Sequence, residues 1–217
     1  MAWCEQHPDE AERESLAPLR ATLAAAAGIP VVAYSSNYVF DGAAISYGEA
    51  DCTAPLNVYG RIKVELEALV TAACGTVVRR NGVFGPEPAP GKNVVLRLIA
   101  SLRSGEPVRA PDDQIADPTW APDLAAASVA IAGSMSGDIW HVPGPAVLSR
   151  YDFARLVADV FGLDLGLIDA IPTAHLSQAA RWTLYGALRR DRYRERFGAE
   201  PVRAPRDALV ELREMAV

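Results

Sequence analysis

The stretch that decides the fold reads PVVAYSSNYVFDG at residues 30–42, then a polar connection, then PLNVYGRIK at residues 55–63. The apolar run ends at Ser36, and a helical pattern carrying Tyr59 and Lys63 follows. Side chains four residues apart on a helix project from one face, so the phenol and the ammonium would lie together. The Ser36 hydroxyl, at the end of the preceding strand, could reach the same spot. These three side chains could together catalyse proton transfer. The Lys63 ammonium would favour the phenolate form of Tyr59, and the Ser36 hydroxyl could orient a carbonyl group of a substrate.

The Tyr-x-x-x-Lys spacing alone has a second interpretation. Lys63 could be a surface residue that pairs with Glu67, four residues later on an ordinary amphipathic helix. The sequence contains two lysines, Lys63 and Lys92, and uses arginine at its other basic positions. The spacing does not choose between the two interpretations.

Composition limits the class of protein. The chain has 217 residues, half of them hydrophobic, which is enough for one domain or one domain with a small lobe. A net charge of -6 with no basic cluster argues against nucleic-acid binding. No apolar run approaches the roughly 18 residues of a membrane span, and the acidic N-terminus has no signal-peptide pattern. Cys4, Cys52 and Cys74 lack metal-binding spacing and indicate free thiols in a reducing, cytoplasmic setting.

The order of the expected elements indicates a parallel α/β sheet. Helices and strands alternate along the first part of the chain, which is typical of right-handed crossovers between parallel strands. A proline-rich loop follows the second strand, where open α/β sheets bind ligands. The patterns predict helices at 8–27, 57–73, 92–104, 122–133 and from Ser149 onward, strands at 30–36, 76–81 and 138–142, and short extended pieces at 107–110 and 114–116.

Several segments together resemble one known family. The segments are SSNYVFDG (35–42), PLNVYGRIKVELE (55–67), RRNGVFGP (79–86), DDQIADPTWAPDLA (112–125), GDIWHVPGPAVLSRYDFARLVADVFG (137–162) and LRRDRYRERFG (188–198). They resemble the extended short-chain dehydrogenase/reductases, and within them the dTDP-4-dehydrorhamnose reductase branch. The resemblance runs from Trp3 to about Gly198. By this resemblance Ser36, Tyr59 and Lys63 occupy the family's Ser/Thr–Tyr–Lys catalytic triad.

The resemblance also implies a division of the chain and a substrate class. It implies one truncated domain with a residual Rossmann-like core and a small α/β substrate lobe. The core would comprise 1–85 and part of 120–145, the lobe 86–120 and 146–200, with a C-terminal helix at 200–217. The family acts on nucleotide-linked keto-sugars, so we expect a polar carbonyl or sugar-like substrate.

Candidate substrate contacts lie on loops and strand ends that would face Tyr59 in the family layout. Two of them are aromatic residues that could equally belong to the core. The candidates are Asn37, Tyr38, Asn81, Phe84, Gln114 and Trp120. Two local departures from the family affect this network: Asn37 stands where the family usually has Asp, and Ser15 where it usually has Asn.

A further departure concerns the cofactor. Family members begin with a strand, a Gly-rich turn and a helix that hold the pyrophosphate of NAD(P). No GxGxxG or GxxGxxG pattern occurs near the start of these 217 residues. We therefore expect no cofactor site in this chain, and no binding of NAD or NADP in the micromolar range. A partner chain or a missing N-terminal segment would have to supply one.

Loss of that half would leave strand 30–36 as a sheet edge. Open apolar edges are aggregation hazards that proteins cover or pair. We expect the N-terminal segment, a second copy of the chain in a homodimer, or a partner chain to cover it.

Three functions follow from these observations. The first is an enzyme that uses the triad for redox-neutral acid–base chemistry, such as epimerisation, dehydration, cyclisation or C–C cleavage, or for reduction with a partner chain. The second is a non-catalytic binding or regulatory subunit that retains the motif. The third is an ordinary NAD(P)-dependent reductase represented by a truncated sequence. None of these three functions involves a metal ion or a nucleic acid.

Overall fold

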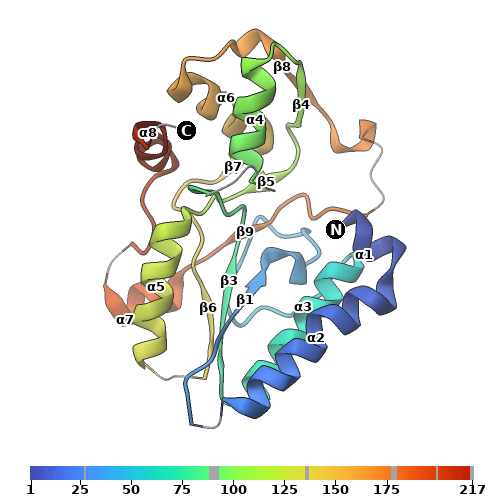
Figure 1. Cartoon of the computed structure of the whole chain (residues 1–217), viewed down its shortest axis with the longest axis vertical. Coiled ribbons are helices and arrows are strands. Elements are labelled where there is room, and N and C mark those ends of the chain that lie inside the picture. The colour runs from blue at the N-terminus through green and yellow to red at the C-terminus, as the bar shows by residue number, and fades with distance from the viewer. Residues whose placement is uncertain (27, 88–92, 135–136, 177–179, 199, 216–217) are drawn as a thin grey trace.

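A three-stranded parallel sheet forms the centre of the protein. The computed structural model describes residues 1–26, 28–87, 93–134, 137–176, 180–198 and 200–215. Strand β1 (Val32–Ser36) pairs with β3 (Thr76–Arg80), which pairs with β6 (Ile139–His141), in the order β1-β3-β6 (Figure 1). The parallel α/β sheet predicted from the alternating elements is thus confirmed.

Helices cover both faces of this sheet. Helices α2 (Pro8–Ala25) and α3 (Val58–Ala72) pack on one face, and α5 (Ala121–Ser134) lies on the other. Successive strand residues explain the two layers: Val77 belongs to the core shared with α2 and α3, and Val78 to the core shared with α5. Both faces of the central strand β3 are buried, as a continuous apolar strand predicts, whereas the edge strand β1 is only partly buried and exposes Tyr34.

Local sequence signals fix the helix ends. The Asn57 side chain accepts a hydrogen bond from the Gly60 amide at 2.8 Å and caps α3. Pro8 opens α2, with two acidic residues in its first turn. The Ser149 side chain accepts a hydrogen bond from the Asp152 amide at 2.9 Å and caps α6 (Arg150–Phe161).

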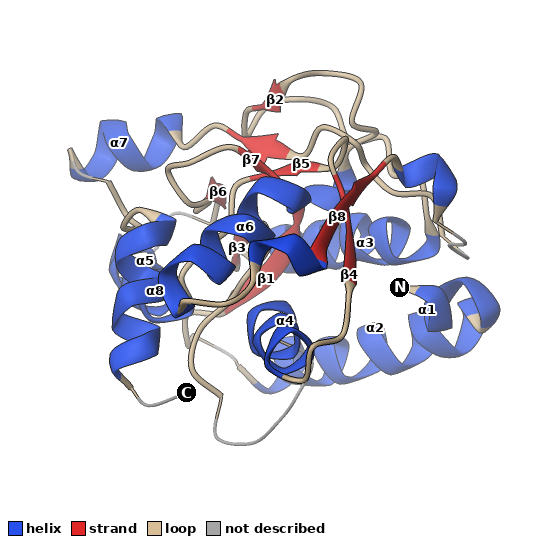
Figure 2. Ribbon diagram, turned by 90° about the horizontal axis from the view of Figure 1, so that it is seen from above, coloured by secondary structure: helices blue, strands red, loops and turns tan. Residues whose placement is uncertain are grey.

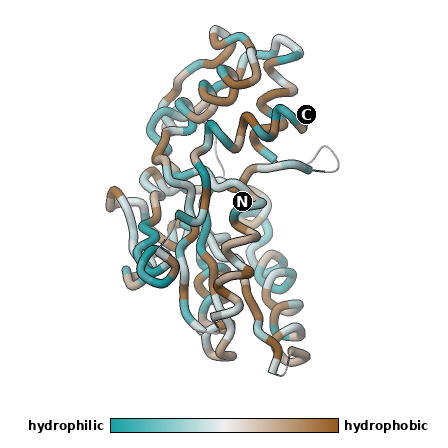
Figure 3. The backbone as a smooth tube through the Cα atoms, turned by 90° about the vertical axis from the view of Figure 1, so that its left-hand side faces the viewer, coloured by the Kyte–Doolittle hydropathy of each residue, from teal (hydrophilic) through white to brown (hydrophobic). Residues whose placement is uncertain are grey.

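A smaller lobe stands beyond the carboxyl ends of the strands (Figures 1 and 2). It contains α6, α4 (Val94–Arg103) and a parallel pair of strands, β4 (Val108–Pro111) with β8 (Ile168–Ile171). Hydrophobic stretches occur in both the sheet and the lobe (Figure 3). The remaining elements are α1 (Ala2–Gln6), η1 (Asn37–Val39), β2 (Ser46–Tyr47), β5 (Ile115–Ala116), β7 (Leu148–Ser149), η2 (Leu165–Leu167), η3 (Thr173–His175), β9 (Ala187–Leu188), α7 (Asp191–Phe197) and α8 (Pro205–Glu214).

The outer edge of β1 carries no paired strand in the described part of the chain. The N-terminal segment instead forms α1 and α2, and α2 packs against α3. Coverage of this edge by a second copy or a partner chain therefore stays a prediction. No helix within the described ranges is long and apolar enough to cross a membrane.

Candidate functional site

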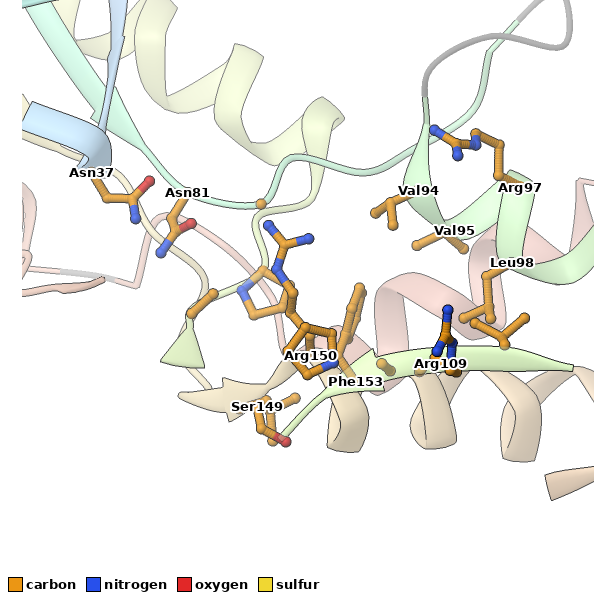
Figure 4. Close-up of a pocket in the computed structure, with 18 of the residues that line it drawn as sticks. Asn37, Asn81, Val94, Val95, Arg97, Leu98, Arg109, Ser149, Arg150 and Phe153 are labelled. Carbon is orange, nitrogen blue, oxygen red and sulfur yellow. The ribbon is translucent and has the colours of Figure 1, made fainter. Parts of the chain in front are cut away.

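A cavity of about 480 Å³ lies between the sheet and the lobe. Its position beyond the carboxyl ends of β1 and β3 is the usual ligand position in open α/β sheets. Residues from η1, the end of β3, α4, β4 and the start of α6 line it, and Figure 4 shows most of them. They include Asn37, Tyr38, Arg80, Asn81, Val94, Val95, Arg97, Leu98, Arg109, Ser149, Arg150 and Phe153. The mixture of apolar side chains with a few polar groups is typical of a small-molecule site.

Four of the lining residues are arginines, which fall into two pairs. Arg97 and Arg109 are exposed and come from α4 and β4, whereas Arg80 and Arg150 are half-buried and lie nearer the sheet. Figure 4 shows Arg150 between Asn37 and Asn81 on one side and Arg109 on the other. None of the four forms an ion pair with a carboxylate among the described residues. The cavity is therefore strongly positive and suits an anionic ligand.

Tyr38 connects the cavity to the Tyr59 region. The Arg150 guanidinium lies 3.4 Å from the Tyr38 hydroxyl, to which it donates, and sits over the Trp182 ring at 4.5 Å. The Tyr38 ring meets the Tyr59 ring edge-on, with ring centres 5.9 Å apart. Burial raises the pKa of Tyr38, and the Arg150 charge partly offsets that rise.

Tyr59 and Lys63 lie together on α3, as their spacing predicts. The Lys63 ammonium is 5.6 Å from the centre of the Tyr59 ring and donates to the Tyr34 carbonyl at 2.9 Å. Burial lowers the pKa of Lys63, and the neighbouring Arg80 charge lowers it further. The ammonium is thus held between β1 and the phenol, although neither Tyr59 nor Lys63 lines the cavity.

Ser36 is buried at the end of β1, where the sequence places it. Its hydroxyl donates to the Asn37 side chain at 3.1 Å and accepts from the Tyr38 amide at 3.4 Å. Ser36 therefore holds Asn37 and Tyr38, which line the end of the cavity nearest the sheet.

Glu67 does not form the ion pair with Lys63 that the alternative interpretation requires. Its side chain is buried and accepts two hydrogen bonds from Arg79, at 2.8 and 2.7 Å. Arg79 also lies 3.3 Å from His141 and over the Phe40 ring at 5.0 Å. Burial, followed by the Arg79 charge, lowers the pKa of His141 to about 3, so this histidine is neutral.

The structure places the predicted substrate contacts in three different environments. Asn37, Tyr38 and Asn81 line the cavity. Phe84 and Trp120 belong to the hydrophobic core. Gln114 is buried and donates to the Thr173 hydroxyl at 3.0 Å, outside the cavity lining.

Sequence reasoning missed the four arginines of the cavity. Arg97 falls on the polar side of an amphipathic helix and Arg109 on a short strand, where arginine usually marks the surface. Arg80 is one half of the Arg79-Arg80 pair, and the alternation of side chains across a strand could have separated it from its neighbour. Arg150 follows the predicted cap Ser149, which gives no sign of a ligand.

Asp117 is a buried acid next to this site that the sequence did not single out. One of its carboxylate oxygens accepts from the Leu188 amide at 2.7 Å, and the other has no hydrogen-bond partner among the described residues. Burial raises the pKa of Asp117 to about 7.

The helix ends beside β1 do not fit the pyrophosphate of a dinucleotide. The first turn of α2 carries Asp9 and Glu10, which repel phosphate. At the start of α3, two backbone amides already have hydrogen-bond acceptors. The Gly60 amide donates to the Asn57 side chain, and the Val58 amide donates to the Glu5 carboxylate at 2.6 Å. These two helices therefore offer no open anion site of the kind that the Rossmann motif uses. Within the described ranges, no cluster of His, Cys, Asp or Glu could hold a metal ion.

The fold and the site define a Rossmann-like α/β protein with a positively charged cavity beside a Tyr–Lys pair. Residues 2–215 match the family described as RmlD substrate binding domain. The chain therefore belongs to this family, and the resemblance drawn from its motifs is confirmed.

Curated relatives carry related names. The chain is 31% identical over 187 residues to a dTDP-4-keto-6-deoxy-D-glucose reductase of Streptomyces niveus, covering 84% of this chain and 64% of that one. It is 32% identical over 191 residues to a dTDP-4-dehydrorhamnose reductase of Sinorhizobium fredii, covering 82% and 64%. The chain thus spans less than two thirds of the length of these relatives.

Solved structures agree on the fold. A dTDP-4-dehydrorhamnose reductase of Clostridium acetobutylicum superposes with a TM-score of 0.89 at 26% identity, covering 100% of this chain and 77% of that one. One from Bacillus anthracis, in complex with NADP, gives a TM-score of 0.80 at 22% identity, covering 87% and 66%. At 22% identity the latter supports the fold alone.

Proposed function

We propose that this chain binds a dTDP-linked keto-sugar in the cavity and moves a proton on its carbonyl oxygen. The observation that carries the proposal is the cavity itself, which is lined by four arginines without carboxylate partners and adjoins Tyr59 through Tyr38. Membership in the RmlD substrate-binding family supports this assignment. The names of the curated relatives supply the sugar class, a dTDP-linked sugar with a carbonyl group.

The outer arginines would hold the diphosphate. Arg97 and Arg109 project from α4 and β4, and guanidinium groups match the geometry of phosphate oxygens. The apolar residues Val94, Val95 and Leu98 lie beside them and would contact the less polar parts of the ligand. This arrangement would direct the sugar toward Asn37 and Asn81 at the carboxyl end of the sheet.

At that end the chain's own residues would handle the proton. In a redox-neutral step the Tyr59 hydroxyl would give its proton to the carbonyl oxygen while a water molecule takes the proton leaving the neighbouring carbon, so that an enol forms with no change of oxidation state. The Lys63 ammonium would stabilise the resulting phenolate. Ser36 would hold the Asn37 side chain in place at the end of the cavity where the carbonyl group lies.

Titration calorimetry with dTDP-glucose tests the binding step. We expect micromolar binding to the unmodified chain, and a loss of roughly tenfold or more in affinity for each of Arg97→Gln and Arg109→Gln. Arg20→Gln is the matched control, because Arg20 pairs on the surface with Glu65 far from the cavity. Absence of binding, or equal loss in the control, would contradict the proposal.

A second candidate is redox-neutral chemistry on the same carbonyl, and the occupied or acidic starts of α2 and α3 favour it. We expect that the 217-residue chain binds neither NAD nor NADP in the micromolar range. Calorimetric titration with the oxidised and reduced forms of both nucleotides measures this. A micromolar dissociation constant for NAD or NADP would contradict this expectation and would favour a reductase that binds its own cofactor.

One substitution distinguishes the proposed catalytic function from a non-catalytic binding or regulatory subunit. Tyr59→Phe removes the hydroxyl and keeps the ring contact with Tyr38. We expect this variant to bind dTDP-glucose as the unmodified chain does and to lose turnover of the dTDP-4-keto sugar by about 100-fold or more. Turnover here is measured as exchange of the C–H protons next to the carbonyl in deuterated water. Exchange at the uncatalysed rate in both the unmodified chain and the variant would favour a binding or regulatory subunit, and equal catalysed exchange in both would rule out Tyr59 as the acid.

A further inference from the structure

We propose that Arg80 and Arg150 form a second anion position in the cavity, which takes a carboxylate carried by the sugar of the bound nucleotide. This inference rests on the proposed sugar-nucleotide function and specifies the chemistry of the reacting end. It adds an acidic group to the sugar, beyond the neutral sugars named for the curated relatives.

Position separates this pair from the outer arginines. Arg80 is the last residue of β3 and Arg150 the first residue of α6, so both lie where the sheet meets the lobe. Asn37 and Asn81 line the same end of the cavity, and Asn81 is held there by a hydrogen bond that its amide nitrogen donates to the Gly186 carbonyl at 2.9 Å. Arg97 and Arg109 come from α4 and β4 at the other side (Figure 4). A diphosphate held by the outer pair would leave the inner pair without a counter-charge.

Neutral side chains hold the Arg150 guanidinium in place and leave its charge without a counter-ion. It stacks over the Trp182 ring at 4.5 Å and donates to the Tyr38 hydroxyl at 3.4 Å. Stacking and one long hydrogen bond fix the plane of a guanidinium and leave its other N–H donors free for a ligand. A side chain recruited only for packing would not need to present this charge to the cavity.

Repulsion among cations supports the need for an anion. Lys63 lies over the Tyr59 ring, Arg150 donates to the Tyr38 hydroxyl, and the Arg80 charge acts on both Tyr38 and Lys63. None of these three cations has an ion-paired carboxylate among the described residues. The Arg80 charge already depresses the pKa of Lys63, which shows that the two cations interact. An anion between the arginines would relieve this repulsion, and bidentate pairing with a carboxylate suits guanidinium geometry.

A matched pair of ligands tests the inference: dTDP-glucuronate and dTDP-glucose differ in the carboxylate at C6. By titration calorimetry we expect the unmodified chain to bind dTDP-glucuronate roughly tenfold or more tightly than dTDP-glucose. In Arg80→Gln and in Arg150→Gln this ratio should fall to about one. Because the Arg80 side chain forms no ion pair with a carboxylate among the described residues, its replacement should not disturb folding.

Further variants and ligands distinguish a failure of this inference from a failure of the proposed function. Arg97→Gln should weaken both ligands and keep their ratio, and the exposed Arg13→Gln on α2 should change neither. Equal affinity for the two ligands in the unmodified chain would overturn the inference and leave the proposed function standing. If binding of dTDP alone depends on Arg80 as strongly as binding of dTDP-glucuronate, the inner pair binds the diphosphate and the inference is wrong. Binding of neither sugar nucleotide contradicts both proposals.

Discussion

Two adjacent arginines on β3 have opposite environments. Arg79 is 2% exposed and forms a bidentate ion pair with Glu67 of α3, next to the neutral His141. Arg80 is half-buried, lines the cavity and has no carboxylate partner in the described chain. Because successive strand residues point to opposite faces, one step along the chain moves the charge from the interior of the fold to a ligand site.

The difference separates a charge that the fold neutralises from charges that the fold leaves exposed to a cavity. A buried charge without a partner is costly, so the chain satisfies Arg79 completely with Glu67, His141 and the Phe40 ring. Arg80 and the other cavity arginines face open space, where water can solvate them until an anion binds. The Arg79 pair therefore stabilises the fold, and the unpaired arginines mark the cavity that we propose as the ligand site.

The largest expected effect comes from breaking the paired charge. Glu67→Gln leaves the Arg79 guanidinium buried without its counter-charge, and we expect the free energy of unfolding to fall by about 3–5 kcal/mol. Urea denaturation followed by circular dichroism measures this change. Glu65→Gln on the same helix is the control, because its exposed pair with Arg20 should contribute less than about 1 kcal/mol. Equal losses in the two variants would show that the buried pair does not anchor α3.

Asp117 provides an intermediate case, a buried carboxyl without an ion pair. Its pKa rises from 3.8 in the unfolded chain to about 7 in the fold, so the folded state holds the proton more tightly. The stability from this group is fully present below pH 3.8 and is lost as pH rises through 7. Between pH 5 and 7 the loss should be about 2 kcal/mol.

Asp117→Asn isolates this contribution. We expect the unfolding free energy of the unmodified chain, minus that of the variant, to fall with rising pH over this window. Subtracting the variant removes the opposite trend from His141, whose lowered pKa of about 3 makes stability rise with pH up to about 6.5. A difference independent of pH would mean that Asp117 is ionised in the fold.

The smallest expected effect on stability concerns Arg80. Arg80→Met should change the unfolding free energy by less than about 0.5 kcal/mol, because the side chain forms no ion pair in the described structure. Its removal should raise the pKa of Lys63, since the Arg80 charge depresses it. NMR titration of ¹³C-labelled lysine side chains reads this shift. A lowered pKa of Lys63 in the variant would contradict the described arrangement.

Much of the fold could be predicted from the sequence because its signals are local. The helix that became α3 was expected at 57–73, and its cap Asn57 and apolar stripe specify it without tertiary information. The short strands β8 and β9 escaped prediction, since four and two residues carry too little periodicity. Their pairing depends on partners far along the chain, β4 and β2.

The site was predictable only in part. Tyr59 and Lys63 could be placed together because helix geometry fixes their spacing. Asn37 and Asn81 were expected near Tyr59 from the layout of the resembled family, and both line the cavity. The partner of Glu67 could not be found, because Arg79 reaches it from another element. The cavity arginines come from four separate elements, so only the folded chain brings their charges together.

The central claim is that the unpaired arginines of the cavity await an anionic nucleotide ligand. A crystal structure of the 217-residue chain grown with dTDP-glucose tests it most directly. We predict the diphosphate against Arg97 and Arg109, the sugar directed toward Asn81, and Arg79 still paired with Glu67. Density for the ligand elsewhere, with the cavity arginines turned to solvent, would contradict the account.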